Sequence, residues 1–523
     1  MSGTVRRTDC WIGIDLGTSS VKVIAIDERS EVIAQTTGDY PMLTPRAGWA
    51  EQDAELWWEV TDSCVRELVT LLPDPSSVQG IGLCGQMHGL TALDEDDRSI
   101  RPAILWNDQR SEQHCQRILE TVGGLDRLLT MTGNHMLPGY TAGKILWLRE
   151  AEPDAFALMR SFLNPKDFLR LRMTGEHATE VSDASGTGLF DVRHRRWSSE
   201  LMAALDVNES LLPRVTESHE ISGHLLPKVA ERWALPAGTP VVGGGGDSVL
   251  QTTATGMTTP GTLGITLGTA GIVAAAADHC PTNEHGQLQV SCGNSPELWH
   301  VMGVALSAGG AFSWLRDALA PLVSDGPLTF DRLVELSRQA APGADNLMFL
   351  PYLVGERCPQ VAPHARGAWI GLTPAHSVSE LARSVMEGVV LNLRQIRDLF
   401  ADAGMAVSEV RVNGGATREP TWLHLLADVL GSDVSTVSAG EQGGALGAAL
   451  LAGVGTGRWA TFEEAIGCIA TTATIRPRPE IVGVYDRLFP HYRSIHSALE
   501  PLYTRLNAEQ ADRFTDSGAA AHA

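Results

Sequence analysis

The sequence lacks the features that direct a chain into or across a membrane. Its first ten residues contain two arginines but no apolar core of signal-peptide length before the apolar segment at Trp11. No stretch approaches the roughly 20 apolar residues that span a bilayer. The longest candidate, residues 439–454, is short and rich in Gly and Ala. We therefore expect a cytoplasmic protein with no membrane partner.

The sequence also lacks paired cysteines and an excess of basic charge. Its 8 cysteines are scattered without a C-x-x-C pair, which favours free thiols over a disulfide frame or a zinc site. The 40 basic and 62 acidic residues give a net charge of −22. A surface this acidic repels nucleic acid and also repels ATP at long range. A nucleotide site would therefore depend on local backbone N–H groups, helix N-termini and a metal ion.

Two common nucleotide-binding motifs are absent. Residues 80–85 fit the spacing G-x-G-x-x-G, but Gly85 leads into another strand rather than the helix that a dinucleotide fold requires. Gly143-Lys144 is followed by Ile145 and lacks the glycine spacing of a P-loop. A nucleotide-binding function would need another way of holding phosphates.

The most informative feature is an internal repeat in a chain of 523 residues, long enough for two large domains. Residues 12–21 and 264–273 each run from an apolar strand through Leu-Gly-Thr and two small residues into a second apolar strand. Both segments predict β-hairpins, and their shared register indicates a duplicated domain. We place the domains at 8–255 and 256–505, and expect residues 506–523 to form a disordered tail.

Between the hairpins, short strands alternate with long amphipathic helices, which predicts an α/β class. The expected strands cover residues 81–93 (strand, turn, strand), 298–304 and 410–412, and the expected helices cover 55–72, 311–319, 377–400 and a segment from Pro420.

Two acidic residues follow apolar or glycine-rich segments and are candidates for chemistry. Asp15 ends an apolar strand, where a carboxylate is costly unless it faces a cation. It is either a ligand for the magnesium of MgATP or a turn-capping residue. Asp247 follows four consecutive glycines at an expected helix start. It is either a general base for a sugar hydroxyl or a helix N-cap.

Polar groups on turns offer phosphate and substrate contacts. Thr18 and Ser19 follow Asp15 on a tight turn that suits phosphate oxygens, and Gly268-Thr269 forms the second such turn. Met87 and His88 stand on a turn between strands and could line a substrate pocket, although a lone His is more often structural. The segment Trp106-Asn107-Asp108 offers an aromatic face and two polar side chains for a sugar, or is a loop with a half-buried Trp.

Taken together, these segments resemble the actin-like ATPase superfamily and, within it, the FGGY carbohydrate kinases. The resemblance spans residues 11–502 and rests on these motifs: Asp15–Thr18, Leu267–Gly271, Val412–Ala416, Gly139–Glu150 and Gly367–Glu387. Further segments resemble the xylulokinase branch: Ala50–Asp53, Gly85–Gly89, Arg101–Asp108, Asn164–Asp167, Asp183–Thr187 and Leu350–Arg357. The implied fold is two actin-like (ribonuclease H-like) ATPase domains that flank a central cleft.

The resemblance also implies roles for individual residues. Asp247 would be the catalytic base, and Asp15 would hold Mg²⁺ together with Asp247. The implied substrate site consists of Met87, His88, Trp106, Asn107, Asp108, Asp247 and Ser248. The implied nucleotide site consists of Thr18, Ser19, Gly268, Thr269, Gly309, Gly414, Gly415 and Glu419. Ser248 departs from the Asn that usually follows the base in xylulokinases, which leaves the exact sugar open.

The sequence thus predicts an ATP-dependent kinase of a ketose, with D-xylulose as the first candidate substrate. One alternative is a kinase of another pentulose or of a polyol. The other is a sugar-responsive regulator of the same fold without catalysis, which the presence of Asp15, Asp247 and both turns disfavours. A homodimer follows the habit of the family, but no feature of the sequence indicates a surface for it.

Overall fold

The computed structural model describes residues 8–323, 326–437, 443–467 and 471–520, with side chains described as far as Asn507. The chain forms two compact units. The first contains residues 1–260, 276–301 and 439–470, and the second contains 261–275, 302–438 and 471–523. Two segments from the second half of the sequence therefore belong to the first unit, a division that a single boundary near residue 255 does not describe.

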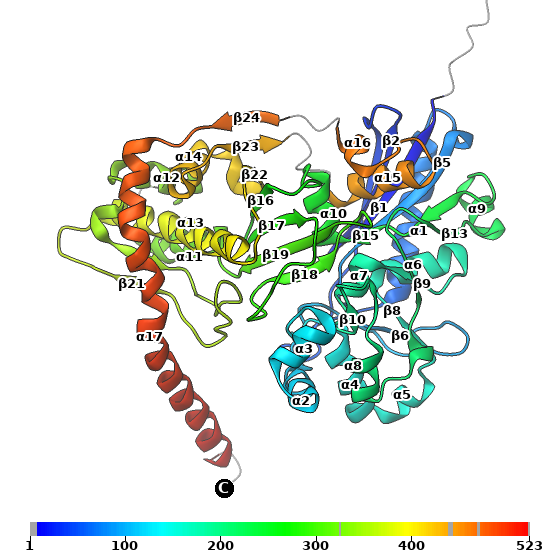
Figure 1. Ribbon diagram of the computed structural model, residues 1–523, viewed down its shortest axis with the longest axis horizontal. Helices are drawn as coiled ribbons and strands as arrows, with labels where there is room; N and C mark the ends of the chain where they lie inside the picture. Colours follow the sequence, from blue (N-terminus) through cyan, green and yellow to red (C-terminus); the bar gives the residue numbers. More distant parts are fainter. Residues whose placement is uncertain (1–7, 324–325, 438–442, 468–470, 521–523) are drawn as a thin grey trace, which may run out of the picture. The chain divides into compact units, whose positions relative to one another are not determined.

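The first unit is built on a seven-stranded sheet in the order β13-β14-β5-β1-β2-β3, with β15 paired to β5 (Figure 1). Its strands are β1 (Cys10–Leu16), β2 (Ser20–Asp27), β3 (Val32–Asp39), β5 (Val78–Gly85), β13 (Ile221–His224), β14 (Pro240–Val242) and β15 (Gly245–Gly246). β1 and β2 pair antiparallel, which confirms the first predicted hairpin. All of residues 80–85 lie within β5, so the G-x-G-x-x-G spacing is part of a strand.

Both faces of this sheet are covered, which explains why β1 is apolar almost throughout. Helix α1 (Ala54–Leu71), capped by the Asp53 side chain, packs on one face. Helix α15 (Gly443–Gly455) packs on the other and consists almost entirely of small and aliphatic residues (Figure 1). Gly13 on β1 and Gly82 on β5 have no room for a Cβ because the α15 backbone lies directly over them. This close approach determines where the first turn of α15 lies.

The remaining elements of the first unit surround this sheet. The helices are α2 (Glu112–Val122), α3 (Leu125–Thr132), α4 (Thr141–Ala151), α5 (Pro153–Leu158), α6 (Pro165–Thr174), α7 (Val181–Ser185), α8 (Ser199–Leu205), α9 (Pro227–Trp233), α10 (Asp247–Ala254) and α16 (Phe462–Ile466). The short strands are β4 (Glu51–Gln52), β6 (Thr91–Leu93), β7 (Ala103–Ile104), β8 (Ser161–Leu163), β9 (Ala178–Glu180), β10 (Phe190–Asp191), β11 (Arg196–Trp197), β12 (Arg214–Thr216) and β18 (Gln289–Cys292).

The second unit repeats the central arrangement in a sheet whose strand order is β18-β19-β17-β16-β22-β23-β24. Besides β18, these are β16 (Thr262–Leu267), β17 (Gly271–Ala277), β19 (Trp299–Ala305), β22 (Glu409–Asn413), β23 (Val434–Val437) and β24 (Thr471–Ile475), with a separate pair β20 (Met348–Leu350) and β21 (Ala368–Ile370). β16 and β17 pair antiparallel, so the second predicted hairpin is confirmed. β16 also pairs parallel to β22, as β1 does to β5.

Five helices pack around the second sheet: α11 (Gly309–Leu319), α12 (Phe330–Gln339), α13 (Val378–Asp402), α14 (Pro420–Leu430) and α17 (Pro479–Ala520). α13 begins with a capping box between Ser377 and Glu380, which explains why this helix was predicted closely. α17 continues into residues 506–520 of the tail that the sequence led us to expect disordered. None of the helices within the described residues combines the length and apolar character that crossing a bilayer requires.

Candidate active site

Three strand ends bring the acidic candidates of the first unit to one edge of the sheet. β1 and β5 run parallel with Asp15 beside Cys84. β5 and β15 also run parallel, with Gly245 beside Cys84 and Gly246 beside Gly85. Asp247 follows β15 directly and begins α10. The carboxyl ends of parallel strands are where α/β proteins place ligands, so this register creates a site from distant parts of the sequence.

Asp15 presents one buried oxygen without a protein partner. Its Oδ1 is fully shielded and accepts no hydrogen bond from the described residues. The loss of solvent raises the pKa of Asp15, while a hydrogen bond with Cys84 and the charge of Lys22 act in the opposite direction. Gly444, in the first turn of α15, lies so close that a Cβ there would stand 2.7 Å from Asp15 Oδ2. An unpartnered buried carboxylate oxygen is costly, so this arrangement suits a cation ligand.

Asp247 is a carboxylate whose surroundings favour proton uptake. Burial raises its pKa to about 7, and the negative charges of Asp15 and Asp183 act in the same direction. Its Oδ1 accepts a hydrogen bond of 2.7 Å from the Ser248 backbone N–H. The hydroxyl of Ser248 in turn contacts Met87 Sδ at 3.1 Å. A general base is most effective with a pKa near the working pH, so this environment suits the predicted role.

The loop after β5 places Met87 and His88 beside these groups. A Cβ on Gly246 would collide with the Met87 side chain, so Asp247 follows a residue in close contact with Met87. His88 has a φ of 69° and its Nδ1 lies 2.6 Å from the Gly186 carbonyl oxygen. Its ring stacks on Tyr140 with centroids 4.8 Å apart. The structure therefore brings Met87, His88, Asp247 and Ser248 together, as the sequence predicts.

The side chains of Trp106, Asn107 and Asp108 differ in exposure and in hydrogen bonding. Trp106 is 42% exposed, and its indole N–H donates to the Thr18 hydroxyl at 3.0 Å. Asn107 has a buried Oδ1 with no described partner. Asp108 is fully buried, and its carboxylate accepts from the Ala50 N–H and from the Arg110 guanidinium. Asp108 thus holds this loop in place, whereas Trp106 is exposed and Asn107 keeps a buried oxygen that accepts no hydrogen bond from the described residues.

The first Gly-Thr turn is held by side chains that carry no role in the sequence prediction. Gln52 donates from Nε2 to the Thr18 carbonyl oxygen at 2.6 Å, and the Tyr40 hydroxyl donates to the Gly17 carbonyl oxygen at 2.6 Å. Ser19 is exposed on this turn. Gln52 also accepts from Gln86, which links the turn to the loop that carries Met87. The sequence gives Gln52 no such role, because the partners of its side chain (Thr18, Pro41, Trp57 and Gln86) are spread along the chain.

The second Gly-Thr turn, in the second unit, packs on the start of α11. The N–H groups of Gly309 and Gly310 donate to the carbonyl oxygens of Gly268 at 2.9 Å and Thr269 at 3.0 Å. A Cβ on Gly309 would stand only 2.6 Å from the Gly268 oxygen. Glycine is therefore required at 309 for the helix to approach the turn. Thr266 occupies the place of Asp15 in this repeat, so this turn carries no carboxylate there.

A pocket of about 430 Å³ adjoins the second turn. Gly268, Thr269, Gly309, Gly415 and Glu419 all line it, together with the aromatic side chains Phe312, Phe330 and Trp422. The volume is within the range of small-molecule sites, and the aromatic walls suit a flat heterocycle.

Gly414 and Glu419 also have structural roles beside the pocket. Gly414 has a φ of 98°, and a Cβ there would collide with the Leu267 backbone, so it allows β22 to turn beside the pocket. Glu419 caps α14 through the Thr421 N–H and pairs with Arg338 at 2.5 Å.

The donor set of the first unit fits Mg²⁺ bound together with phosphates. Mg²⁺ usually takes one or two carboxylates and completes its shell with water and phosphate oxygens. The unpartnered Asp15 Oδ1 and the nearby Asp247 supply two such carboxylates. Within the described residues, no group of three or more His, Cys, Asp or Glu side chains could hold a metal ion by itself.

Comparison with known proteins gives one consistent result over both units. Residues 10–254 match the N-terminal domain, and residues 263–456 the C-terminal domain, of the FGGY family of carbohydrate kinases. The chain is 38% identical to a xylulose kinase of Escherichia coli, covering 94% of this chain and 99% of the relative. It is 36% identical to a xylulose kinase of Bacillus subtilis, covering 95% and 98%. A crystal structure of a xylulose kinase from Brucella ovis superposes with a TM-score of 0.88 at 34% identity, covering 94% and 100%.

Proposed function

Because the chain belongs to the FGGY family of carbohydrate kinases, we propose that it transfers the γ-phosphoryl group of ATP to D-xylulose and forms D-xylulose 5-phosphate. The choice of sugar follows the xylulose kinases at 36% and 38% identity over nearly their whole length. The structural observation that carries the proposal is the convergence of Asp15, Asp247 and the Met87-His88 loop at one sheet edge.

In the proposed reaction, Asp247 accepts the proton of the terminal sugar hydroxyl. The O5–phosphorus bond forms as the bond between the γ-phosphorus and the bridging oxygen of ADP breaks. Support for this role comes from the position of Asp247 at the N-terminus of α10 and from its raised affinity for a proton. Met87, His88, Trp106, Asn107 and Ser248 would orient the sugar so that the correct hydroxyl faces Asp247.

Asp15 and Asp247 would hold Mg²⁺, which supplies neutralising charge to the phosphates when bound. Thr18 and Ser19 on the first turn, and Gly268 and Thr269 on the second, would contact phosphate oxygens. The aromatic pocket, which Gly309, Gly415 and Glu419 line, would take the nucleoside, and Gly414 would hold the backbone beside it. The local backbone and metal contacts would offset the repulsion between ATP and an acidic chain.

The test is a panel of sugars offered to the purified protein with MgATP, with ADP formation as the readout. D-Xylulose should give the highest kcat/KM, above D-ribulose, L-ribulose and the alditols. A higher kcat/KM for another pentulose or a polyol would support the kinase activity but assign it a different substrate. Ser248, which contacts Met87 in the substrate loop, is the reason to measure this alternative. Absence of ADP formation with every sugar would support the non-catalytic regulator instead.

The expected homodimer stays a prediction. Light scattering coupled to size-exclusion chromatography would give the molar mass in solution and test it directly.

A further inference from the structure

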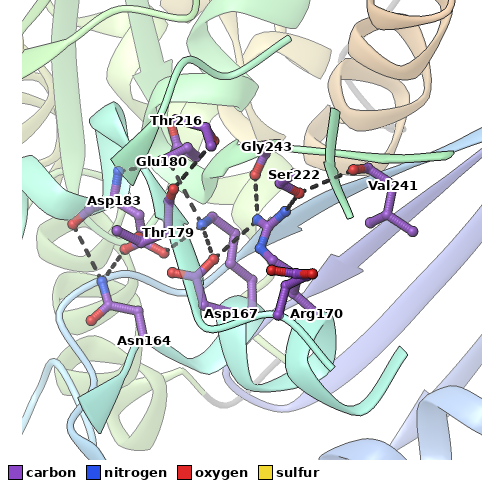
Figure 2. Close-up of polar contacts among 12 residues, drawn as sticks. Asn164, Asp167, Arg170, Thr179, Glu180, Asp183, Thr216, Ser222, Val241 and Gly243 are labelled. Carbon is purple, nitrogen blue, oxygen red and sulfur yellow. Dashed lines mark hydrogen bonds and ion pairs between the residues drawn. The ribbon is translucent and has the colours of Figure 1, made fainter. Parts of the chain in front are cut away.

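Five charged side chains lie together in the interior of the first unit, next to the glycine run that precedes Asp247. Lys166, Asp167, Arg170, Glu180 and Asp183 have no exposed surface, and we call them the ion cluster. Figure 2 labels four of them, Asp167, Arg170, Glu180 and Asp183. Lys166 Nζ lies 2.6 Å from Asp167, 3.0 Å from Asp183 and 3.6 Å from Glu180. Burying charges costs more free energy than packing apolar side chains of similar size, so a cluster like this is poorly explained by stability alone.

Arg170 holds the first part of the glycine run. Its guanidinium donates to the carbonyl oxygen of Gly243 at 2.5 Å and to the Ser222 hydroxyl (Figure 2). It also donates to the carbonyl oxygen of Val242 at 2.8 Å. Gly244 has a φ of 75°, and a run of glycines has little conformational preference of its own. The position of Asp247 therefore depends on contacts that come from outside the run.

Ser182 holds the last part of the run. Its hydroxyl oxygen accepts the Gly246 N–H at 3.0 Å and donates its own proton to Glu180 Oε1 at 2.7 Å. Glu180 also accepts the backbone N–H groups of Ser182 and Asp183, which fixes the first turn of α7. Ser182 is thus an oriented acceptor for the N–H group of the residue immediately before Asp247.

The same short helix also reaches the substrate loop. α7 ends at Gly186, and the carbonyl oxygen of Gly186 contacts His88 Nδ1 at 2.6 Å. One element, fixed to the ion cluster through Glu180 and Asp183, therefore contacts both the Asp247 segment and His88. This is the arrangement expected of a scaffold that sets the distance between a base and its substrate.

We propose that Ser182 is a positioning residue for Asp247, and that the ion cluster acts on the reaction through Ser182 and Arg170 by holding the glycine run in one conformation. The inference rests on the proposed function, because it assumes that Asp247 is the base. It concerns the alignment of Asp247 and leaves nucleotide binding in the second unit unchanged.

Ser182→Ala tests the proposal, and Ser185→Ala is its matched control. Both serines lie on α7 and are buried, and each hydroxyl accepts one backbone N–H at 3.0 Å, that of Gly246 for Ser182 and that of Cys292 for Ser185. Ser182→Ala should lose more thermal stability than Ser185→Ala, because Ser182 also donates to the buried Glu180 carboxylate whereas Ser185 donates to the Val181 carbonyl oxygen. Ser182→Ala should lower kcat about 10-fold to 100-fold with the KM for ATP within about twofold of wild type, whereas Ser185→Ala should keep kcat within about twofold. Equal kcat values for the two variants would overturn the proposal.

A double variant distinguishes a loss of Asp247 alignment from a general loss of structure. If Ser182 acts through Asp247, Ser182→Ala should cause no further loss in the residual turnover of Asp247→Ala. A further loss of the full single-variant size would contradict the proposal. If Asp247→Ala keeps nearly full turnover, the base role of Asp247 fails, and the positioning role of Ser182 fails with it. If Asp247→Ala is inactive while Ser182→Ala matches Ser185→Ala, only the positioning role fails.

Hydrogen exchange of the wild-type protein provides a test that needs no variant. The N–H groups of Gly243, Gly244 and Gly246 are bonded to Glu220, Ser218 and Ser182, so the segment 243–246 should exchange slowly for a glycine run. Exchange as fast as that of an exposed loop would contradict the proposal, whether or not Ser182→Ala folds.

Discussion

The indole N–H of Trp106 donates a hydrogen bond to the hydroxyl oxygen of Thr18 at 3.0 Å. The two residues were predicted for different ligands, Trp106 for the sugar and Thr18 for phosphate. The bond fixes the orientation of the indole, and it leaves the proton of the Thr18 hydroxyl available to another acceptor. The aromatic wall of the sugar site and the first phosphate turn are therefore one structural element of the first unit.

Trp106→Phe should weaken substrate binding because it keeps an aromatic ring but removes this bond. A hydrogen bond of about 1 kcal/mol corresponds to an increase of about threefold to tenfold in the KM for the sugar. Trp197→Phe is the control, since the Trp197 indole bonds the Pro213 carbonyl oxygen away from the site. Initial-rate kinetics would measure the KM for the sugar in both variants. An unchanged KM in Trp106→Phe would show that the hydrogen bond does not contribute to sugar binding.

Gly444→Ala should inactivate the enzyme by moving Asp15. The new methyl group would stand 2.7 Å from Asp15 Oδ2 and would also collide with Cys84 Sγ, so the carboxylate must shift. A displacement of about 1 Å in a reacting group can cost about 100-fold in rate. Gly483→Ala in α17 meets only the end of Arg487 at 3.6 Å and should stay active. Turnover measured against Mg²⁺ concentration would test this, and a fully active Gly444→Ala would argue against Asp15 as a metal ligand.

Gly309→Ala should impair the nucleotide rather than the sugar. The Cβ would stand 2.6 Å from the Gly268 carbonyl oxygen and push the second turn away from α11. We expect the KM for ATP to rise about tenfold or more, with the KM for the sugar within about twofold. Titration with ADP by calorimetry would measure the same loss without turnover. A selective rise in the KM for the sugar would show that the second turn has been assigned to the wrong ligand.

Glu356 should make the stability of the protein depend on pH. Its buried carboxylate accepts from the Leu306 and Arg357 N–H groups and from Asn392, and burial raises its pKa to about 7. The folded state therefore binds the Glu356 proton more tightly than the unfolded state, in which its pKa is near 4.5. Proton binding by Glu356 therefore stabilises the folded state fully below about pH 4.5, and this stabilisation is lost as the pH rises through 7.

Glu356→Gln removes the titration, so its melting temperature should rise relative to that of wild type between pH 5 and pH 8. The difference in stability should reach at most about 3 kcal/mol. Glu59→Gln, on the exposed side of α1, is the control and should leave the pH profile unchanged. Parallel pH profiles for wild type and Glu356→Gln would contradict the assignment.

Local features of the sequence were sufficient to predict both hairpins and the helix start at Asp247. An apolar strand, a glycine turn and a second strand are close in sequence, so their pairing needs no distant partner. Asp247 follows the glycine run directly, and its helix begins there.

Contacts between distant segments could not be predicted in this way. Ser182 and Gly246 are 64 residues apart, and no periodicity of either segment indicates that they meet. The first turn of α15 reaches Asp15 from the last quarter of the chain because Gly13 and Gly82 let its backbone approach the sheet. Asp108 looked like a sugar ligand because its partners, Ala50 and Arg110, are revealed only by the folded loop.

The most direct test of the account is the turnover of Asp247→Ala with MgATP and D-xylulose, measured beside its affinity for ADP. If Asp247 takes the hydroxyl proton, kcat should fall by about 100-fold to 10,000-fold, while the dissociation constant of ADP stays within about twofold of wild type. A loss of only a few-fold in kcat with binding intact would show that another group, or none, accepts the proton.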